Sequence, residues 1–408
     1  MVSYRQSEKR RRENDHLLLK VWDKQMKSTR KKCLAILPIP ALLICALAFS
    51  FGAYAAEEEP SLLNKGTLFT EAERDLDALS DLSGSRHITV RDGQDVDIGG
   101  AGIWIIDGMA SNVTISVDAP EDAVVYLLLK GLRIENRDRP CIYVGSAGKV
   151  YLIPTGSSKL TVSKAFRKDS DRKANAVIYS CTDLTLRGEA PLIINSSKNG
   201  IVCRDKLRFL GGEYAITAGS KAVAADDAIW IAGGDFRLKA EIDGLHAENE
   251  DDNMQGSIYI GGGSFDIDVA DDAIHGQTMV QIDDGRLTIV ADEGIESTRV
   301  LINGGEMDIR ATGDGINAGR KSDAYRPKIE ITGGSVTVTM DGKDPDAIDS
   351  NADLVISGGT VNVSGAGIDW DGELDFSGGT VIIEGETVSE IPNASTHRRD
   401  DTGAKRNI

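Results

Sequence analysis

The sequence is short of aromatic residues and proline. Phe, Trp and Tyr make up 5% of the 408 residues, and 10 prolines stand against 44 glycines. This balance is untypical of a large helical protein and typical of a chain of many short strands and tight turns. The length suffices for two average domains or for one elongated repeat domain.

Positive charge is scarce after residue 55, and so is cysteine. The formal net charge is -18; residues 1–55 hold 11 basic and 4 acidic side chains, which leaves 35 and 60, a net -25, for residues 56–408. Such an acidic surface repels phosphate backbones, so we expect no nucleic-acid partner. The three cysteines in that part, Cys141, Cys181 and Cys203, lack metal-site spacing, and we expect free thiols.

An apolar run over residues 34–51 follows three basic residues and ends in Ala53-Tyr54-Ala55. This is the anatomy of a secretory signal peptide. We therefore predict a signal peptide over residues 26–55, and we expect residues 1–25 to be a mis-annotated leader because Met26 begins an n-region of normal length.

An alternative start at Met1 would retain the apolar segment 34–55 as a membrane anchor, with residues 1–25 as a cytoplasmic tail. Only in that case do we expect a membrane contact. Both interpretations place the rest of the chain outside the cell, secreted or at the cell surface, and we expect a monomer there.

A glycine pair, once Asp-Gly, recurs along the second half of the chain. The steps between its second glycines are 22, 29, 22, 20, 29, 25 and 20 residues, and these glycines are Gly212, Gly234, Gly263, Gly285, Gly305, Gly334, Gly359 and Gly379. Apolar residues alternate before and after every pair, as in Leu207/Phe209 and Tyr214/Ile216. Alternation between glycine turns predicts strands with one buried face.

A third element, such as Asp243-Gly244-Leu245 or Asp314-Gly315-Ile316, closes each coil. Three short strands in about 21 residues cannot bury a core alone, so the coils must stack. The sequence predicts an all-β fold, a right-handed parallel β-helix over residues 87–393, with right-handed connections between its strands.

The segments on either side of this solenoid are shorter. We expect residues 56–86 to hold a capping helix, because Thr70-Glu71-Ala72-Glu73 forms a capping box. Such a helix would shield the open edge of the stack. The polar residues 394–408 are predicted to be a disordered tail.

Acidic residues form columns beside the third element. Stacked carboxylates less than 5 Å apart repel each other, and oxygen-rich sites of this kind suit Ca²⁺. The predicted calcium ligands are Asp243, Glu248, Asp251, Asp252, Asp271, Asp272, Glu293, Glu296, Asp314, Asp346 and Asp349. No Cys/His cluster in the sequence argues for zinc. Asp-Gly is also a common turn dipeptide, so repeated turns alone could align aspartates; the acidic insertion after Ala247 favours the cation.

A second insertion, residues 319–327, is basic and carries a tyrosine. Beside an acidic, calcium-loaded stripe it could hold an anionic sugar chain, with outward aromatic residues as stacking platforms; a solvated surface loop is the plain alternative. The predicted sugar-binding residues are Trp230, Tyr259, Arg320, Lys321, Tyr325 and Trp370. No nucleophile or phosphate-binding motif is present, and no residue is singled out as catalytic. Lys321, Arg320 or Lys343 could serve as the base of a calcium-assisted lyase.

The ordered series of motifs from Asp243-Gly244-Leu245-His246 to Asp346-Ala347-Ile348-Asp349, with the terminal Glu390-Ile391-Pro392-Asn393, resembles a family of secreted bacterial carbohydrate-binding proteins. The similarity covers residues 69–393. The resemblance implies a right-handed parallel β-helix shaped like pectate lyases, and calcium bound by stacked acids. It also implies binding of cellulose-like glucans or polygalacturonate without established hydrolysis.

Two coils depart from the family's Asp-Gly-Ile pattern by having Ala273 and Ala347. Alanine resists positive φ, so we expect differently shaped turns there. The function expected is thus calcium-dependent, non-catalytic binding of an extracellular polysaccharide. A pectate-type lyase and a surface adhesin or structural protein are the alternatives.

Overall fold

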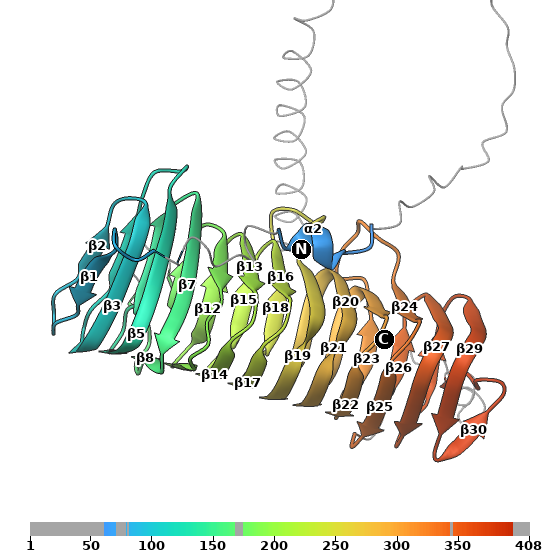
Figure 1. Cartoon of the computed structure of the whole chain (residues 1–408). Coiled ribbons are helices and arrows are strands. Elements are labelled where there is room, and N and C mark those ends of the chain that lie inside the picture. Colours follow the sequence, from blue (N-terminus) through green and yellow to red (C-terminus); the bar gives the residue numbers. More distant parts are fainter. Residues whose placement is uncertain (1–60, 71–78, 80, 168–173, 343–345, 395–408) are drawn as a thin grey trace, which may run out of the picture. The chain divides into compact units, whose positions relative to one another are not determined.

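The computed structural model of this chain describes residues 61–70, 79, 81–167, 174–342 and 346–394. The predicted signal peptide, the helix expected after Thr70, Lys343 and the tail beyond residue 394 lie outside this part. The described residues form a parallel β-helix whose successive coils follow one another from β1 to β29 (Figure 1). Each coil contributes to three parallel ladders, here numbered 1, 2 and 3.

Ladder 3 contains the acidic motifs and has twelve strands in eleven parallel pairings. They are β2 (Val96–Ile98), β4 (Ile115–Asp118), β6 (Ile142–Ser146), β9 (Ala176–Ser180), β12 (Asn199–Cys203), β15 (Val223–Ala225), β18 (Leu245–Ala247), the first parts of β20 (Asp272–Ala291) and β21 (Glu293–Ile302), β23 (Ile316–Ala318), β26 (Ile348–Ser350) and β28 (Ile368–Trp370).

Ladder 1 contains the strands that precede each glycine pair. They are β1 (Arg86–Thr89), β3 (Gly102–Ser111), β5 (Val124–Asn136), β7 (Lys149–Gly156), β10 (Leu184–Leu186), β13 (Lys206–Phe209), β16 (Ala228–Ile231), β19 (Ser257–Val269), later parts of β20 and β21, β24 (Lys328–Ile331), β27 (Asp353–Ser364) and β29 (Leu374–Ile383). Ladder 2 consists of the ends of β3, β5, β19, β20, β27 and β29 together with β8 (Ser158–Val162), β11 (Leu192–Ser196), β14 (Glu213–Ala218), β17 (Asp235–Ala240), β22 (Glu306–Ala311) and β25 (Ser335–Met340).

The predicted alternation is confirmed residue by residue. In ladder 1, Leu207 pairs with Ile229 and Ile229 with Ile258, and each of these side chains is fully buried. Burying one such side chain stabilises the fold by about 1.5–3 kcal/mol. Inside ladder 2 the rings of Phe236 and Phe265 stack with centroids 4.8 Å apart. The apolar interior is therefore continuous from coil to coil.

One coil of ladder 3 lacks the acidic turn by which the other coils were recognised in the sequence. Val223 of β15 pairs with Ile201 on one side and Leu245 on the other, although Lys221-Ala222 replaces the acidic turn before it. The strands of residues 87–195, whose pattern is less regular, belong to the same ladders, as predicted.

The glycines of the acidic turns are required by close approach between coils. A Cβ on Gly244 would lie 2.5 Å from the carbonyl oxygen of Ala273, and one on Gly315 would lie 2.5 Å from that of Ala347. Neither glycine has a positive φ. The expected difference at Ala273 and Ala347 is therefore wrong, because these turns never needed positive φ, and both alanines are fully buried in the same register.

The described helix α2 (Lys65–Leu68) begins at Asn64, whose side chain accepts a hydrogen bond from Gly66 N. Its segment packs on ladder 1 in the middle of the stack: the backbone N–H of Leu63 donates to Gln281 Oε1 at 2.8 Å, and Phe69 is fully buried beside Tyr259. This helix therefore covers a lateral face and does not shield the first coil. None of the helices in the described part is long and apolar enough to cross a membrane.

At the other end, β30 (Glu386–Val388) turns back antiparallel to β29. Asn393 bridges to Ile368, and its Nδ2 donates to the carbonyl oxygen of Trp370 at 2.8 Å. The chain following β29 thus covers part of the last coil and satisfies backbone groups that no further coil would meet.

Candidate functional site

The outer face of ladder 3 carries two polar columns. Because successive side chains of a strand point to opposite faces, the residue after each buried Ile or Leu points outward. This outward column runs through His246, His275, Glu296, Asn317, Asp349 and Asp369. The turn column two residues before the buried residue runs through Lys221, Asp243, Asp272, Glu293, Asp314 and Asp346. We call the two columns together the polar strip.

In the first half of the polar strip, the acids face cations of the protein itself. Oδ2 of Asp243 lies 3.1 Å from Nζ of Lys221 and 2.8 Å from Nδ1 of His246. Burial raises the pKa of Asp243, but His246 and Lys221 outweigh it, so the pKa lies below its usual value. Asp243 is 3% exposed, and it is ionised because these two groups compensate its charge.

The next coils repeat this pairing. Nδ1 of His275 lies 2.8 Å from Oδ2 of Asp272 and 2.9 Å from Oε2 of Glu296, and Lys321 pairs with the other oxygen of Glu296. Burial alone would lower the pKa of His275, but the two carboxylates raise it to about 9. The pKa of Glu293 moves the other way for a carboxyl group: burial and the charges of Glu296 and Asp272 raise it to about 8.

In the second half of the polar strip, Asp349 faces other acids. Burial and the negative charges of Asp314, Asp346, Asp369 and Asp371 raise the pKa of Asp349 to about 7. The backbone N–H of Asp346 donates to Oδ1 of Asp314 at 3.0 Å, which holds two adjacent turns together. Carboxylates gather around a half-buried Asp349 at this end of the strip, where an added cation would relieve their repulsion.

The two predicted insertions border the polar strip. In the acidic one, Asn249 Oδ1 accepts hydrogen bonds from the backbone of Asp251 and Asp252, and Oδ1 of Asp252 accepts from Met254 N at 3.0 Å. The basic insertion reaches it, because Ser322 Oγ donates to the carbonyl oxygen of Asn253. The carboxylate of Asp252 therefore helps to fix the conformation of the acidic insertion itself.

Beside the acidic insertion lies an open cleft of about 550 Å³. Tyr179, Arg204, Lys221 and His246 line it from ladder 3, and Asn249, Glu250 and Asp251 line it from the insertion. Nε of Arg204 pairs with Oδ2 of Asp226 at 2.8 Å, while about half of the Arg204 side chain stays exposed. The size suits a small part of a ligand, and the lining offers both donors and acceptors.

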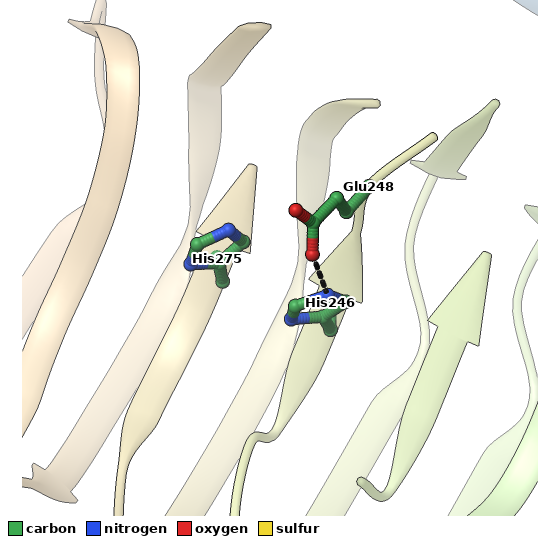
Figure 2. Close-up of side chains that lie close together, drawn as sticks. All are labelled: His246, Glu248 and His275. Carbon is green, nitrogen blue, oxygen red and sulfur yellow. Dashed lines mark hydrogen bonds and ion pairs between the residues drawn. The ribbon is translucent and has the colours of Figure 1, made fainter. Parts of the chain in front are cut away.

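His246 and Glu248, which line this cleft, come together with His275 of the next coil (Figure 2). The imidazole rings stack with centroids 4.5 Å apart and planes 13° apart. Nε2 of His246 lies 3.1 Å from a carboxylate oxygen of Glu248, and this contact lowers the pKa of Glu248 to about 2. Stacking thus brings together two histidines that are 29 positions apart in the chain, and the spacing in the sequence does not reveal this pair.

The structure also corrects the expectation for Tyr259. Its side chain is fully buried below Phe69, and its hydroxyl donates to Oδ2 of Asp283 at 2.7 Å. A sugar ring cannot stack there. Trp230, on the preceding coil, packs partly against the same cluster, and the guanidinium of Arg208 lies 4.8 Å from its ring.

The other predicted sugar-binding residues are spread over the molecule. Arg320 is exposed near Asp323, Lys321 is engaged with Glu296, and Tyr325 is half-buried in the same loop. Trp370 packs partly on the core at the last coil. The structure does not bring these residues into one site, and none of the six predicted residues lines the cleft.

Sequence reasoning missed Tyr179, Arg204 and Asn249. A signal existed for Tyr179, which follows the buried Ile178 in the same outward column as His246, and its ring stacks on that of Tyr143 at 6.0 Å. The coil of Tyr179 precedes the regular glycine repeats, so the repeat spacing does not reveal that this residue belongs to the outward column.

The chain is similar to known proteins. A family model described as "Carbohydrate-binding domain-containing protein" matches residues 92–299 and 292–401. A protein of that description from Acetivibrio thermocellus is 30% identical over 130 residues, which are 31% of this chain and 46% of the relative, so the match spans about half of that relative. A solved structure, a polysaccharide lyase-like protein from C. thermocellum studied as a gadolinium derivative, is 26% identical with a TM-score of 0.46, covering 54% of this chain and 93% of that one.

Proposed function

This chain belongs to the family of carbohydrate-binding domain-containing proteins, and from that premise we propose that it binds an extracellular polysaccharide without cleaving it. The observation that carries the proposal is the 550 Å³ cleft beside the polar strip. Its lining combines the tyrosine ring of Tyr179 with amide, guanidinium and carboxylate groups. Sugars, which present hydroxyl groups around apolar ring faces, are ligands that such a mixture recognises.

An acidic polysaccharide such as polygalacturonate fits better than a neutral, cellulose-like glucan. Among the described residues, no Phe, Trp or Tyr belongs to the exposed large apolar side chains, so a broad stacking platform for neutral chains is lacking there. Residues 56–408 carry a net -25 and repel a uronate chain unless cations bridge the two sets of carboxylates. Arg204, half-exposed in the cleft, can contribute a charge-assisted contact to a uronate.

We propose calcium as the bridging cation and the second half of the polar strip as its location. Asp349 supports this choice, because burial and four neighbouring carboxylates raise its pKa to about 7. Asp314, Asp346, Asp369 and Asp371 would share the ion, and oxygen donors in this number suit Ca²⁺. When bound, the ion would neutralise these acids and offer open positions to a uronate. Asp243, Asp272 and Glu296 in the first half already lie beside cations of the protein and fit calcium less well.

The surroundings of Lys321 support binding without cleavage. A lyase needs a base near the sugar's C5 proton with a pKa near the working pH. Burial lowers the pKa of Lys321, but its ion pair with Glu296 outweighs this and raises the pKa above the usual value. Lys321 therefore holds its proton more tightly than an ordinary lysine, and it is a poor general base.

Binding of polygalacturonate and of a neutral glucan, measured by calorimetry with calcium and again with chelator, tests the proposal. We expect calcium-dependent binding of the acidic chain. Arg204→Ala should weaken it about tenfold, or 1.4 kcal/mol. Arg237→Ala is the matched control, because Arg237 is an exposed, ion-paired arginine on ladder 2. Equal affinity for both glycans in chelator would contradict the role of calcium.

Incubation with polygalacturonate and calcium, followed by the absorbance of unsaturated products, separates a binding protein from a lyase. We expect no product. Steady product formation that Lys321→Ala abolishes would establish the lyase instead.

We also propose that the body of the chain acts outside the cell. Residues 1–55, which carry the predicted export signal, lie outside the described part. Sequencing the N-terminus of the secreted protein should give Ala56 as the first residue. Recovery of the intact chain from membranes only would show that the apolar segment is an anchor.

A further inference from the structure

The stacked histidines of the polar strip form a second kind of site, distinct from the acidic calcium cluster. We propose that His246, His275 and Glu248 bind one divalent transition-metal ion, of the class of Zn²⁺, Co²⁺, Ni²⁺ or Cu²⁺. One ligand atom from each of the three side chains lies within 4.8 Å of the others. Two imidazoles and one carboxylate form a ligand set that these borderline ions prefer and that calcium, which selects oxygen, does not.

A carboxylate lies beside Nδ1 of each imidazole. Nδ1 of His246 lies 2.8 Å from Asp243, and Nδ1 of His275 lies 2.8 Å from Asp272. Both aspartates are buried and stand three positions before their histidine, so the two coils repeat one arrangement. With Nδ1 turned to a carboxylate, Nε2 is the ring nitrogen that remains for a metal. Metal-binding histidines are held in this way, with the second nitrogen on a carboxylate.

Glu248, the third ligand, lies on the side of the histidines toward which Nε2 of His246 points. Figure 2 shows the Glu248 carboxylate beside His246, with His275 parallel to it on the next coil. A tetrahedral ion with bonds of about 2.1 Å keeps its ligand atoms about 3.4 Å apart, so the three groups must converge by about an ångström. Glu248 can move, because it begins a surface loop and 47% of its side chain is exposed.

The site also leaves room for a further ligand. Three protein ligands leave a fourth position open, as in zinc sites that accept an exogenous ligand. His246 and Glu248 line the cleft, so this position faces it, and a sugar oxygen could occupy it.

Titration with Co²⁺, followed by its visible d–d absorption, tests the site. The full chain is prepared without a histidine tag, and excess calcium is present throughout to occupy oxygen-rich sites. We expect one ion per chain with the intense absorption of a four-coordinate site, and stoichiometric displacement by Zn²⁺. Asp243→Asn should weaken the binding about 10- to 100-fold, and His246→Gln or His275→Gln should weaken it more.

Two further variants distinguish loss of a metal ligand from loss of folding. Glu248→Gln lies on an exposed loop, so it should fold normally and still weaken Co²⁺ binding at least about tenfold. His87→Gln is the control, because His87 is an exposed histidine beside Asp107 on the first coil and should leave the binding unchanged. A weak octahedral spectrum, or the same affinity in folded Glu248→Gln and His246→Gln, would overturn the proposal. No polysaccharide is present, so this result is independent of glycan binding.

Discussion

The two halves of the polar strip use the same turn and the same ladder, yet they balance charge differently. Around His275 the carboxylates of Asp272 and Glu296 touch imidazole and ammonium groups of the protein. Around Asp349 the neighbours are four further aspartates, and the pKa of Asp349 rises to about 7. The ladder is the same in both halves, so the outward residue of each coil decides whether its neighbours meet an imidazole or a further carboxylate.

Glu296, which lies beside cations of the protein, needs no added ion, whereas a cation that bound beside Asp349 would stabilise the fold. The cleft lies beside the first half of the polar strip. The four predictions that follow change one half at a time.

The largest effect is expected from His275→Gln in protein free of transition metal. It leaves Asp272 and Glu296 with less compensation at a buried position, which should lower the free energy of unfolding by about 3 kcal/mol. The folded pKa of His275, about 9, lies above its ordinary value of 6.5. Its contribution is therefore complete below pH 6.5 and is lost as the pH rises through 9.

Urea denaturation of both proteins at pH 6, 7.5 and 9.5 measures this. The difference between them should shrink as the pH rises. A difference that stays constant would mean that His275 contributes by packing and not by its charge.

Calcium should produce the second largest effect, in the other half. At a concentration 100 times the dissociation constant, an ion that binds only the folded state adds about 2.7 kcal/mol. Asp349→Asn should remove most of this gain, and chelator should lower the melting temperature of the wild-type protein only.

Without calcium the order should reverse. The pKa of Asp349 is raised in the folded state, so its ionisation destabilises the fold increasingly as the pH rises from about 4 to 7. Asp349→Asn should therefore melt at a higher temperature than the wild type in chelator at pH 8, and at the same temperature at pH 4. Identical melts with and without calcium would refute the calcium site.

The close approach of the coils is tested by Gly315→Ala, which adds a Cβ 2.5 Å from the carbonyl oxygen of Ala347 and 2.3 Å from Val338. Overpacking of this kind should cost about 1–3 kcal/mol. It would also spread the acidic turns and weaken calcium binding, which titration in the same variant would show. The reverse change in the other half, Ala273→Gly, relieves no clash and should cost at most about 1 kcal/mol.

The smallest effect is expected from Lys321→Met. Lys321 and His275 lower the pKa of the buried Glu296 to about 2, but 35% of the lysine side chain is exposed and water screens its charge. The loss at neutral pH should stay within about 1 kcal/mol, well below that of His275→Gln. A larger loss in urea denaturation would show that the ammonium, and not the imidazole, neutralises this half.

The sequence alone determined the ladders and their register. Leu207, Ile229 and Ile258 stand at a fixed offset from a glycine pair, and period-2 alternation leaves only one face that can be buried. The coil of Val223 could not be recognised in this way. Its alanine and valine are buried in the ladder, but the acidic turn that marks the other coils is replaced by Lys221-Ala222. A carbohydrate-binding family, too, could be expected from the ordered series of motifs, and the family match confirms that part of the expectation.

Only the tertiary structure decided which groups meet. Stacking places His246 on His275 and Lys321 on Glu296, although each pair is separated by 25 residues or more and insertion lengths in between follow no period. The tertiary structure also brings the N-terminal segment over Tyr259. Alternation along the strand shows that Tyr259 points outward, but it does not show which segment covers this side chain. Periodicity specifies the direction in which a side chain points from its own coil, whereas its partner depends on the neighbouring coil and on chain that returns from far away.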